Sequence, residues 1–95
     1  MTHILRIEHP VPDFGGWKKA FDSDPARRQA SGVRRYRVIR PVDDSKFAIV
    51  DLEFESRAEA DSFLGKLKGL WSRVEGSVMN SPQARIFELE SAIEY

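Results

Sequence analysis

The sequence contains no cysteine, which excludes disulfides and thiolate chemistry and leaves a zinc site only His3, His9 and carboxylates to draw on. It has no excess charge either, since 15 basic residues balance 15 acidic ones. That balance argues against nucleic acid or an anionic membrane as the main partner. No spacing of potential ligands indicates a metal site. Neither a signal-peptide pattern nor an apolar run long enough to cross a membrane is present, so we expect a soluble, cytoplasmic protein.

The size of the chain limits its organisation. With 95 residues, of which 41% are hydrophobic, it can form one domain over residues 1–95 with a single modest core. No internal repeat, low-complexity tract or linker divides it. A domain this small is near the size at which association with a partner adds useful stability.

Residues 33–40 and 47–54 both have the composition of β-strands, and turn-forming residues lie between them. A hairpin centred on Asp44 brings three pairs together on one face: Arg37 with Asp51, Arg35 with Glu53, and Ile39 with Ile49. On the other face it pairs apolar or aromatic residues: Tyr36 with Leu52, and Val38 with Val50. A slip by one residue would exchange the two faces, so the pattern predicts this register.

The N-terminal third predicts a strand followed by two helices. The strand covers residues 2–9 and stops at the prolines that follow. Asp13 is a suitable N-cap for a first helix with an apolar stripe of Phe14, Trp17 and Phe21. A second, short helix is expected to begin at Asp24 and Pro25 and to end at Gly32.

The C-terminal half predicts one long helix and a last strand. Ser56 to Glu59 has the spacing of a capping box, and the apolar residues after it follow the 3, 4, 7 rhythm of a helix as far as Val74. Gly76 is expected to end this helix, residues 77–82 to form a loop, and residues 83–90 to form the last strand.

This order of elements predicts an α+β fold of the ferredoxin-like βαββαβ type, with a four-stranded antiparallel sheet and both helices on one face. The opposite face stays uncovered in a monomer. We expect it to carry Ile4, Arg6, Glu8, Arg35, Arg37, Ile39, Phe47, Ile49, Asp51 and Glu53. The face that the last strand presents stays open, because Ala84 and Ile86 are as apolar as Phe87 and Leu89.

The fold order, the long helix that ends in Leu70 and Trp71, and the closing segments 76–79 and 83–88 resemble the dimeric α+β barrel superfamily, with its antibiotic-biosynthesis-monooxygenase-like and small polyketide-cyclase-like members. The resemblance implies a homodimer in which two open sheet faces meet in a barrel. The barrel lining would then consist of Arg35, Arg37, Phe47, Ile49, Asp51 and Glu53. Its charged members form either simple cross-strand ion pairs or a polar lining that orients an anionic or oxygenated ligand. The resemblance carries no catalytic signature, because the asparagine used by the haem-degrading and quinone-forming branches lies near the first strand, whereas Asn80 is the only asparagine here.

An RNA-binding module of the RNA-recognition-motif type has the same topology, and residues 46–52 resemble its third-strand motif. That family stacks bases on exposed aromatic side chains of the two central strands. Here Phe47 is the only aromatic residue expected on that surface, and Asp51 and Glu53 would repel phosphate. The sequence therefore disfavours RNA binding.

Two classes of function remain open. The protein is either a binding module for a small hydrophobic or aromatic molecule, or a cofactor-independent monooxygenase, cyclase or isomerase. Neither class needs a cofactor. The predicted ligand-binding residues are Trp17, Phe21, Trp71, Val78 and Met79, although both tryptophans also fit simple core positions. The candidate polar or catalytic residues are His9, Tyr36, Asn80 and Arg85.

Overall fold

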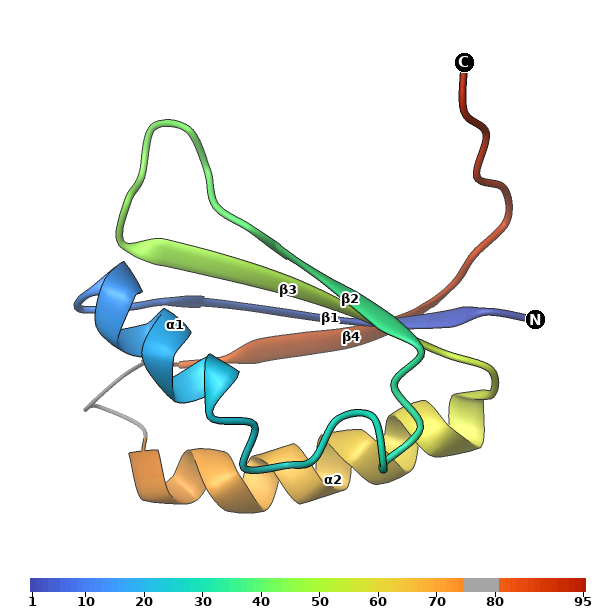
Figure 1. Cartoon of the computed structure of the whole chain (residues 1–95), viewed down its shortest axis with the longest axis horizontal. Coiled ribbons are helices and arrows are strands. Elements are labelled where there is room, and N and C mark those ends of the chain that lie inside the picture. The colour runs from blue at the N-terminus through green and yellow to red at the C-terminus, as the bar shows by residue number, and fades with distance from the viewer. Residues whose placement is uncertain (75–80) are drawn as a thin grey trace.

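The computed structural model describes residues 1–74 and 81–95. Its elements are β1 (His3–Pro10), α1 (Phe14–Asp22), β2 (Arg35–Ile39), β3 (Phe47–Phe54), α2 (Arg57–Val74) and β4 (Gln83–Glu88). The strands form one antiparallel sheet in the order β2-β3-β1-β4, and Figure 1 shows α1 and α2 together on one side of it. The predicted ferredoxin-like α+β fold is confirmed. Neither helix within the described ranges is long and apolar enough to span a membrane.

The predicted hairpin register is confirmed. β2 and β3 pair Arg37 with Asp51 and Arg35 with Glu53, as the alternation of charge required. β2 begins two residues later than expected, at Arg35, and β4 ends at Glu88 rather than at residue 90. β1 lies between β3 and β4, so its residues are paired on both sides.

Both helices begin where their capping residues predict. Asp13 has an extended backbone (φ −150°, ψ 116°), and its carboxylate accepts a hydrogen bond from the Gly16 amide at 2.8 Å. At the start of α2, the Ser56 hydroxyl accepts a hydrogen bond from the Glu59 amide at 3.2 Å. The predicted end of α2 at Gly76 and most of the predicted loop 77–82 lie outside the described residues.

The predicted short helix over residues 24–32 is wrong, because this segment forms a series of turns. Asp24 (φ 55°) and Arg27 (φ 50°) both have left-handed backbones, which a helical cap and a helix interior do not allow. The segment is attached to α2 instead: the Lys66 ammonium donates to the Ala26 carbonyl at 2.8 Å and to the Ser31 hydroxyl at 3.0 Å. It therefore forms a wall between the helices rather than a third helix.

The hydrophobic core lies between the sheet and the helices. Its side chains come from β1, β3, α1, α2 and the turn segment, and the largest fully buried ones are Leu5, Leu52 and Phe54. On β4 it is Ala84 and Ile86 that pack against this core. Strand alternation then places Arg85 and Phe87 on the opposite face, which settles the side that the sequence left open.

The opposite, open face of the sheet carries the ten residues predicted for it, with a buried carboxylate at its centre. Asp51 is 3% exposed and accepts two hydrogen bonds from the Arg6 guanidinium, each at 2.8 Å, and a longer one from Arg37 at 3.4 Å. The Arg6 hydrogen bonds are the main reason that the pKa of Asp51 is lowered. The predicted partner, Arg37, is thus the weaker of two, since Arg6 on β1 provides the closer pair.

Candidate functional site

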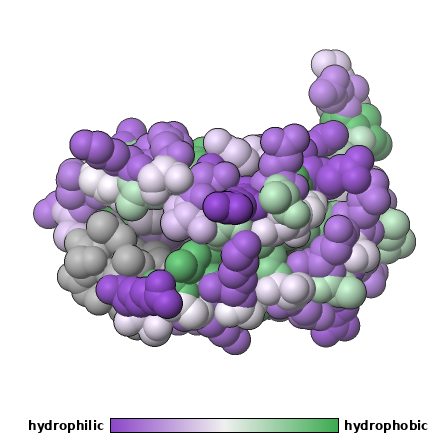
Figure 2. Space-filling view, turned by 60° about the horizontal axis from the view of Figure 1, so that its bottom comes forward, coloured by the Kyte–Doolittle hydropathy of each residue, from purple (hydrophilic) through white to green (hydrophobic). Residues whose placement is uncertain are grey.

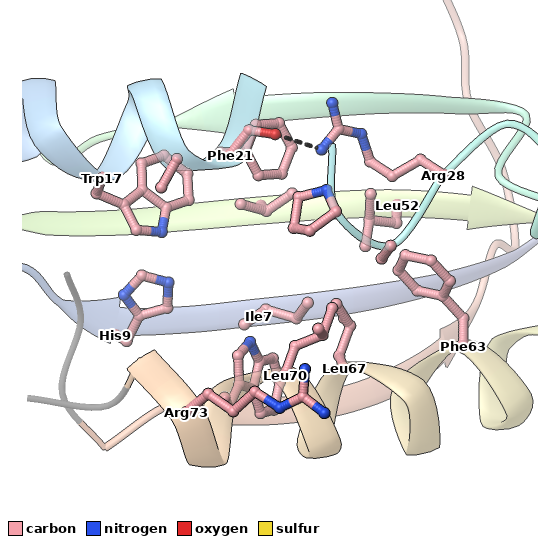
Figure 3. A pocket seen from close by; sticks show the side chains of 15 residues that line it. Ile7, His9, Trp17, Phe21, Arg28, Leu52, Phe63, Leu67, Leu70 and Arg73 are labelled. Atoms are coloured by element: carbon pink, nitrogen blue, oxygen red, sulfur yellow. Dashed lines mark hydrogen bonds between the residues drawn. The ribbon is translucent and has the colours of Figure 1, made fainter. Parts of the chain in front are cut away.

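A cavity of about 200 Å³ lies between the sheet and the two helices. Figure 3 shows Trp17 and Phe21 of α1 on one side, Leu67 and Leu70 of α2 on the other, and Ile7 of β1 behind them. The walls are almost entirely apolar. On the face shown in Figure 2 the surface is mostly hydrophilic, with hydrophobic residues exposed only in small areas.

A chain of aromatic ring contacts runs along the α1 side of the cavity. His9 meets Trp17 edge to face with ring centroids 5.5 Å apart, and Trp17 stacks on Phe21 at 5.2 Å. Phe21 then contacts Tyr36 edge to face, also at 5.2 Å. These contacts follow from the spacing of Trp17 and Phe21 on one face of α1, and they fix the orientation of the wall.

His9 is the cavity-lining residue whose charge can change near neutral pH. It follows Leu5 and Ile7 on the core-facing side of β1 and is 2% exposed. Its Nδ1 lies 3.3 Å from the Pro10 carbonyl oxygen. Burial lowers the pKa of His9 below its ordinary value, because the charged imidazolium loses its hydration there. The ring is therefore neutral at physiological pH.

Arg28 places a cation at the edge of the same cavity. Its guanidinium lies 3.9 Å from the centroid of the Phe21 ring and 4.8 Å from that of Tyr36, and it donates a hydrogen bond to the Phe21 carbonyl at 2.8 Å. It also lies 3.5 Å from the Asp24 carboxylate. With these partners, Arg28 serves first to hold the turn segment against α1.

Arg73 contributes a second cation, from the last turn of α2. It lines the cavity, its side chain is exposed, and no residue in the described parts of the chain forms an ion pair with it. Within residues 1–74 and 81–95, no group of three or more His, Asp or Glu side chains is placed to hold a metal ion. The charged groups of the cavity wall are thus basic.

The structure brings four of the predicted site residues together around this cavity: His9, Trp17, Phe21 and Trp71. Tyr36 lies outside it and contacts it through Phe21. Arg85 does not line the cavity, because it lies opposite Arg6 in the β1–β4 register, on the open face of the sheet. Val78, Met79 and Asn80 lie outside the described residues. The six predicted barrel-lining residues, Arg35, Arg37, Phe47, Ile49, Asp51 and Glu53, all lie on the open face.

Arg28 and Arg73 were not among the predicted cavity residues. Arg28 lies in the segment that is predicted to be helical. That prediction does not bring its side chain into contact with Phe21. Arg73 had a detectable signal, since it lies close to Leu70 in the predicted helix and within one turn of it. The RNA alternative gains no support, because β1 presents Ile4, Arg6 and Glu8 to the open face and offers no stacking aromatic.

No protein-family model matches the sequence, and no match is found among the curated proteins. Among solved structures, the fold is similar to that of SnoaB, a cofactor-independent oxygenase from Streptomyces nogalater, with a TM-score of 0.73 and 12% identity over 99% of this chain and 98% of that one. It is also similar to a dimeric ferredoxin-like protein from an uncultured marine organism, with a TM-score of 0.67 and 6% identity over 97% of this chain and 98% of that one.

A third similar structure is a mutant of MhuD with two manganese protoporphyrin IX molecules bound per active site. Its TM-score is 0.68, with 18% identity over 99% of this chain and 98% of that one. At these identities the likeness concerns the fold alone. The same fold occurs in a structure described as a putative antibiotic biosynthesis monooxygenase, from Nitrosomonas europaea, so the fold that the sequence resemblance implied is confirmed.

Proposed function

We propose that this protein binds a small hydrophobic or aromatic molecule, without a cofactor, in the cavity between the helices and the sheet. The observation that carries this proposal is a cavity with an aromatic wall and only a few polar groups at defined places, His9, Arg28 and Arg73 among them. Ligand sites are typically built in this way, with apolar walls for affinity and isolated polar groups for orientation.

The size of the cavity supports a ligand of one or two rings. An engineered apolar cavity of roughly 150 Å³ in another protein stays dry and binds benzene. The cavity here measures about 200 Å³ and is lined by Leu67, Leu70 and aromatic rings. Filling it removes apolar surface from water on both the ligand and the protein, which provides the driving force.

The two tryptophans of the sequence, Trp17 and Trp71, both line the cavity, so intrinsic fluorescence reports on its occupancy. Titration with one- and two-ring aromatic compounds should quench this fluorescence to saturation, and Trp71→Phe should remove part of the change. Ala20→Leu adds volume at the cavity wall and should weaken binding. Ala58→Leu, at an exposed position of α2 outside the cavity, is the matched control. Equal binding in the two leucine variants would contradict the proposed site.

We further propose that the protein is a homodimer that buries the open sheet face. Ile39 and Phe87 are 41% and 38% exposed on that face, and exposed apolar side chains of this size are typical of an interaction surface. The similar ferredoxin-like protein from the marine organism is described as dimeric. Light scattering should therefore give about twice the monomer mass of 10.9 kDa, and Ile49→Glu should shift the protein towards monomer. A monomeric wild type would contradict the barrel.

A cofactor-independent oxygenase, cyclase or isomerase is the second candidate, and His9 is the observation that favours it. A neutral histidine in an apolar cavity can accept a proton from a bound substrate. SnoaB, which has the same fold, is a cofactor-independent oxygenase. Oxygen consumption with multiple turnovers of a polycyclic phenol, lost in His9→Phe, would support catalysis over binding alone.

A further inference from the structure

We propose that the ligand is a phenol or a similarly acidic enol, bound with its hydroxyl group donating a hydrogen bond to Nε2 of His9. This inference rests on the proposed function, because it names the chemical class of the molecule that the cavity binds. It starts from which nitrogen of His9 carries the proton.

The tautomer of His9 follows from its single hydrogen bond. Nδ1 lies 3.3 Å from the carbonyl oxygen of Pro10, and a carbonyl oxygen can only accept. Nδ1 must therefore carry the proton in this contact. In a neutral imidazole the other nitrogen, Nε2, then has a free lone pair and acts as an acceptor.

Within the described residues, His9 makes one hydrogen bond, from Nδ1 to the Pro10 carbonyl. Its Nε2 therefore has no hydrogen-bond partner among them. Every fully buried side-chain nitrogen or oxygen of the described residues has a hydrogen-bond partner. Because Nε2 has none, it is not fully buried. His9 is 2% exposed overall and lines the cavity. The open surface of Nε2 therefore belongs to the cavity, where a ligand can reach it.

The groups around the cavity favour a neutral His9 and an electron-rich ligand oxygen. Arg28 on the turn segment and Arg73 on α2 are the charged residues of the wall, and both are cations. The cavity residues from α1 and β3, such as Trp17 and Val50, carry no charge. Burial also lowers the pKa of His9. Nε2 of the neutral ring thus stays an acceptor, and a bound phenol keeps its proton and donates it in a hydrogen bond to Nε2.

Other ligand chemistries fit this position less well. A ketone, ether or carboxylate would place a lone pair against the lone pair of Nε2. An ammonium group would place an unpaired charge in an apolar cavity whose charged wall residues, Arg28 and Arg73, are already cations. A weakly acidic hydroxyl on a flat apolar body provides the donor and fits the rest of the wall.

The test compares naphthalene, 2-naphthol and 2-methoxynaphthalene as fluorescence-quenching ligands. Wild-type protein should bind 2-naphthol about tenfold more tightly than either other compound, the effect of one hydrogen bond made in an apolar cavity. His9→Phe keeps an aromatic ring but removes the acceptor. In that variant 2-naphthol should bind no better than naphthalene, because its hydroxyl is buried without a partner. His3→Phe changes the other histidine of β1, which does not line the cavity, and should behave as wild type.

A pH series adds a readout that a merely structural role of His9 would not change. Below the lowered pKa of His9 both ring nitrogens are donors, so the preference for 2-naphthol over 2-methoxynaphthalene should decline as the pH falls, in wild type and not in His9→Phe.

The outcomes separate this inference from the proposed function. Binding of naphthalene without any preference for 2-naphthol would overturn the inference and leave the cavity as a binding site. A preference that persists undiminished in His9→Phe would overturn the role of His9. Failure of all three compounds to bind wild type would overturn both. Where His9→Phe does not fold, His9→Gln replaces it, since its amide can still accept and should retain a reduced preference.

Discussion

The two faces of the sheet hold their buried polar groups in opposite ways. On the open face, Asp51 is surrounded by donors, with two short hydrogen bonds from Arg6 and a longer one from Arg37. On the helix-covered face, His9 makes one hydrogen bond to the described residues, through Nδ1, and its side chain lines the cavity. A fully paired group stabilises the structure, whereas a half-paired group at a cavity wall is available to a ligand.

The same contrast explains two lowered pKa values with different causes. The pKa of Asp51 is lowered because the Arg6 guanidinium stabilises its charged form. The pKa of His9 is lowered because burial destabilises its charged form. One group is thus held ionised and the other neutral, on opposite sides of the same two central strands, and each prediction below tests one part of that difference.

The largest effect is expected from the core on the helix-covered side. Leu52 is 1% exposed. Leu52→Ala should lower the free energy of unfolding by about 2–5 kcal/mol, because the truncation leaves a cavity. Ile49 lies on the same strand but on the open face, and it is only partly buried. Ile49→Ala should cost less than about 2 kcal/mol in urea unfolding at the same protein concentration. Equal costs would indicate that the proposed dimer buries Ile49 as completely as the core buries Leu52.

The next effect concerns the two arginines around Asp51. Arg6→Ala removes two hydrogen bonds from a buried carboxylate and should destabilise the protein by about 2–3 kcal/mol. Arg37, whose side chain is 66% exposed and lies 3.4 Å from Asp51, should contribute less than about 1 kcal/mol. Chemical unfolding of Arg6→Ala and Arg37→Ala measures both values. A larger loss of stability in Arg37→Ala than in Arg6→Ala would mean that Arg37, the partner expected from the hairpin, is the main partner of Asp51.

The third effect is a pH dependence of stability that depends on His9. Its pKa is lower in the folded protein than in the unfolded chain, so between these two values the unfolded chain binds more protons. Stability should therefore fall as the pH drops below about 6.5, by at most roughly 1.4 kcal/mol per pH unit. Thermal unfolding from pH 7.5 to 5 should show this slope in wild type and His3→Phe, and a shallower one in His9→Phe.

The lowered pKa of Asp51 acts in a separate range. Its contribution to stability is complete above the ordinary carboxyl pKa, near 3.8, and is lost only as the pH falls through the still lower pKa of the folded state. It does not overlap with the His9 range. A slope between pH 7.5 and 5 that is unchanged in His9→Phe would show that another group is responsible.

The smallest effect is expected for Arg35 and Glu53 at the edge of the open face. Their charged groups lie 3.9 Å apart and the Arg35 side chain is 74% exposed, so solvent screens the pair. Arg35→Ala should change the unfolding free energy by less than about 0.5 kcal/mol. A substantially greater loss, concentrated at low salt, would indicate that this edge is covered in the dimer.

The local parts of the structure were predictable because they depend on neighbours in the sequence. Asp13 and Ser56 cap their helices through backbone amides three residues away, and the hairpin register follows from the period-2 alternation of charge around Asp44. The turn segment after α1 was not predictable in this way. Asp24 and Arg27 have left-handed backbones, and Lys66 of α2 donates to the Ala26 carbonyl between them, a contact 40 residues away in sequence that a cap-like Asp-Pro pair does not indicate.

The candidate site shows the same division. The sequence by itself determined the α+β order, the strand faces, and the aromatic stripe of Trp17 and Phe21, since each depends on a fixed period of the backbone. Only the tertiary structure decided that Arg6 rather than Arg37 is the main partner of Asp51, that Arg28 stacks on Phe21, and that Arg85 faces away from the cavity. These contacts join residues on separate elements, and their distances depend on how those elements pack, which no spacing along the chain records.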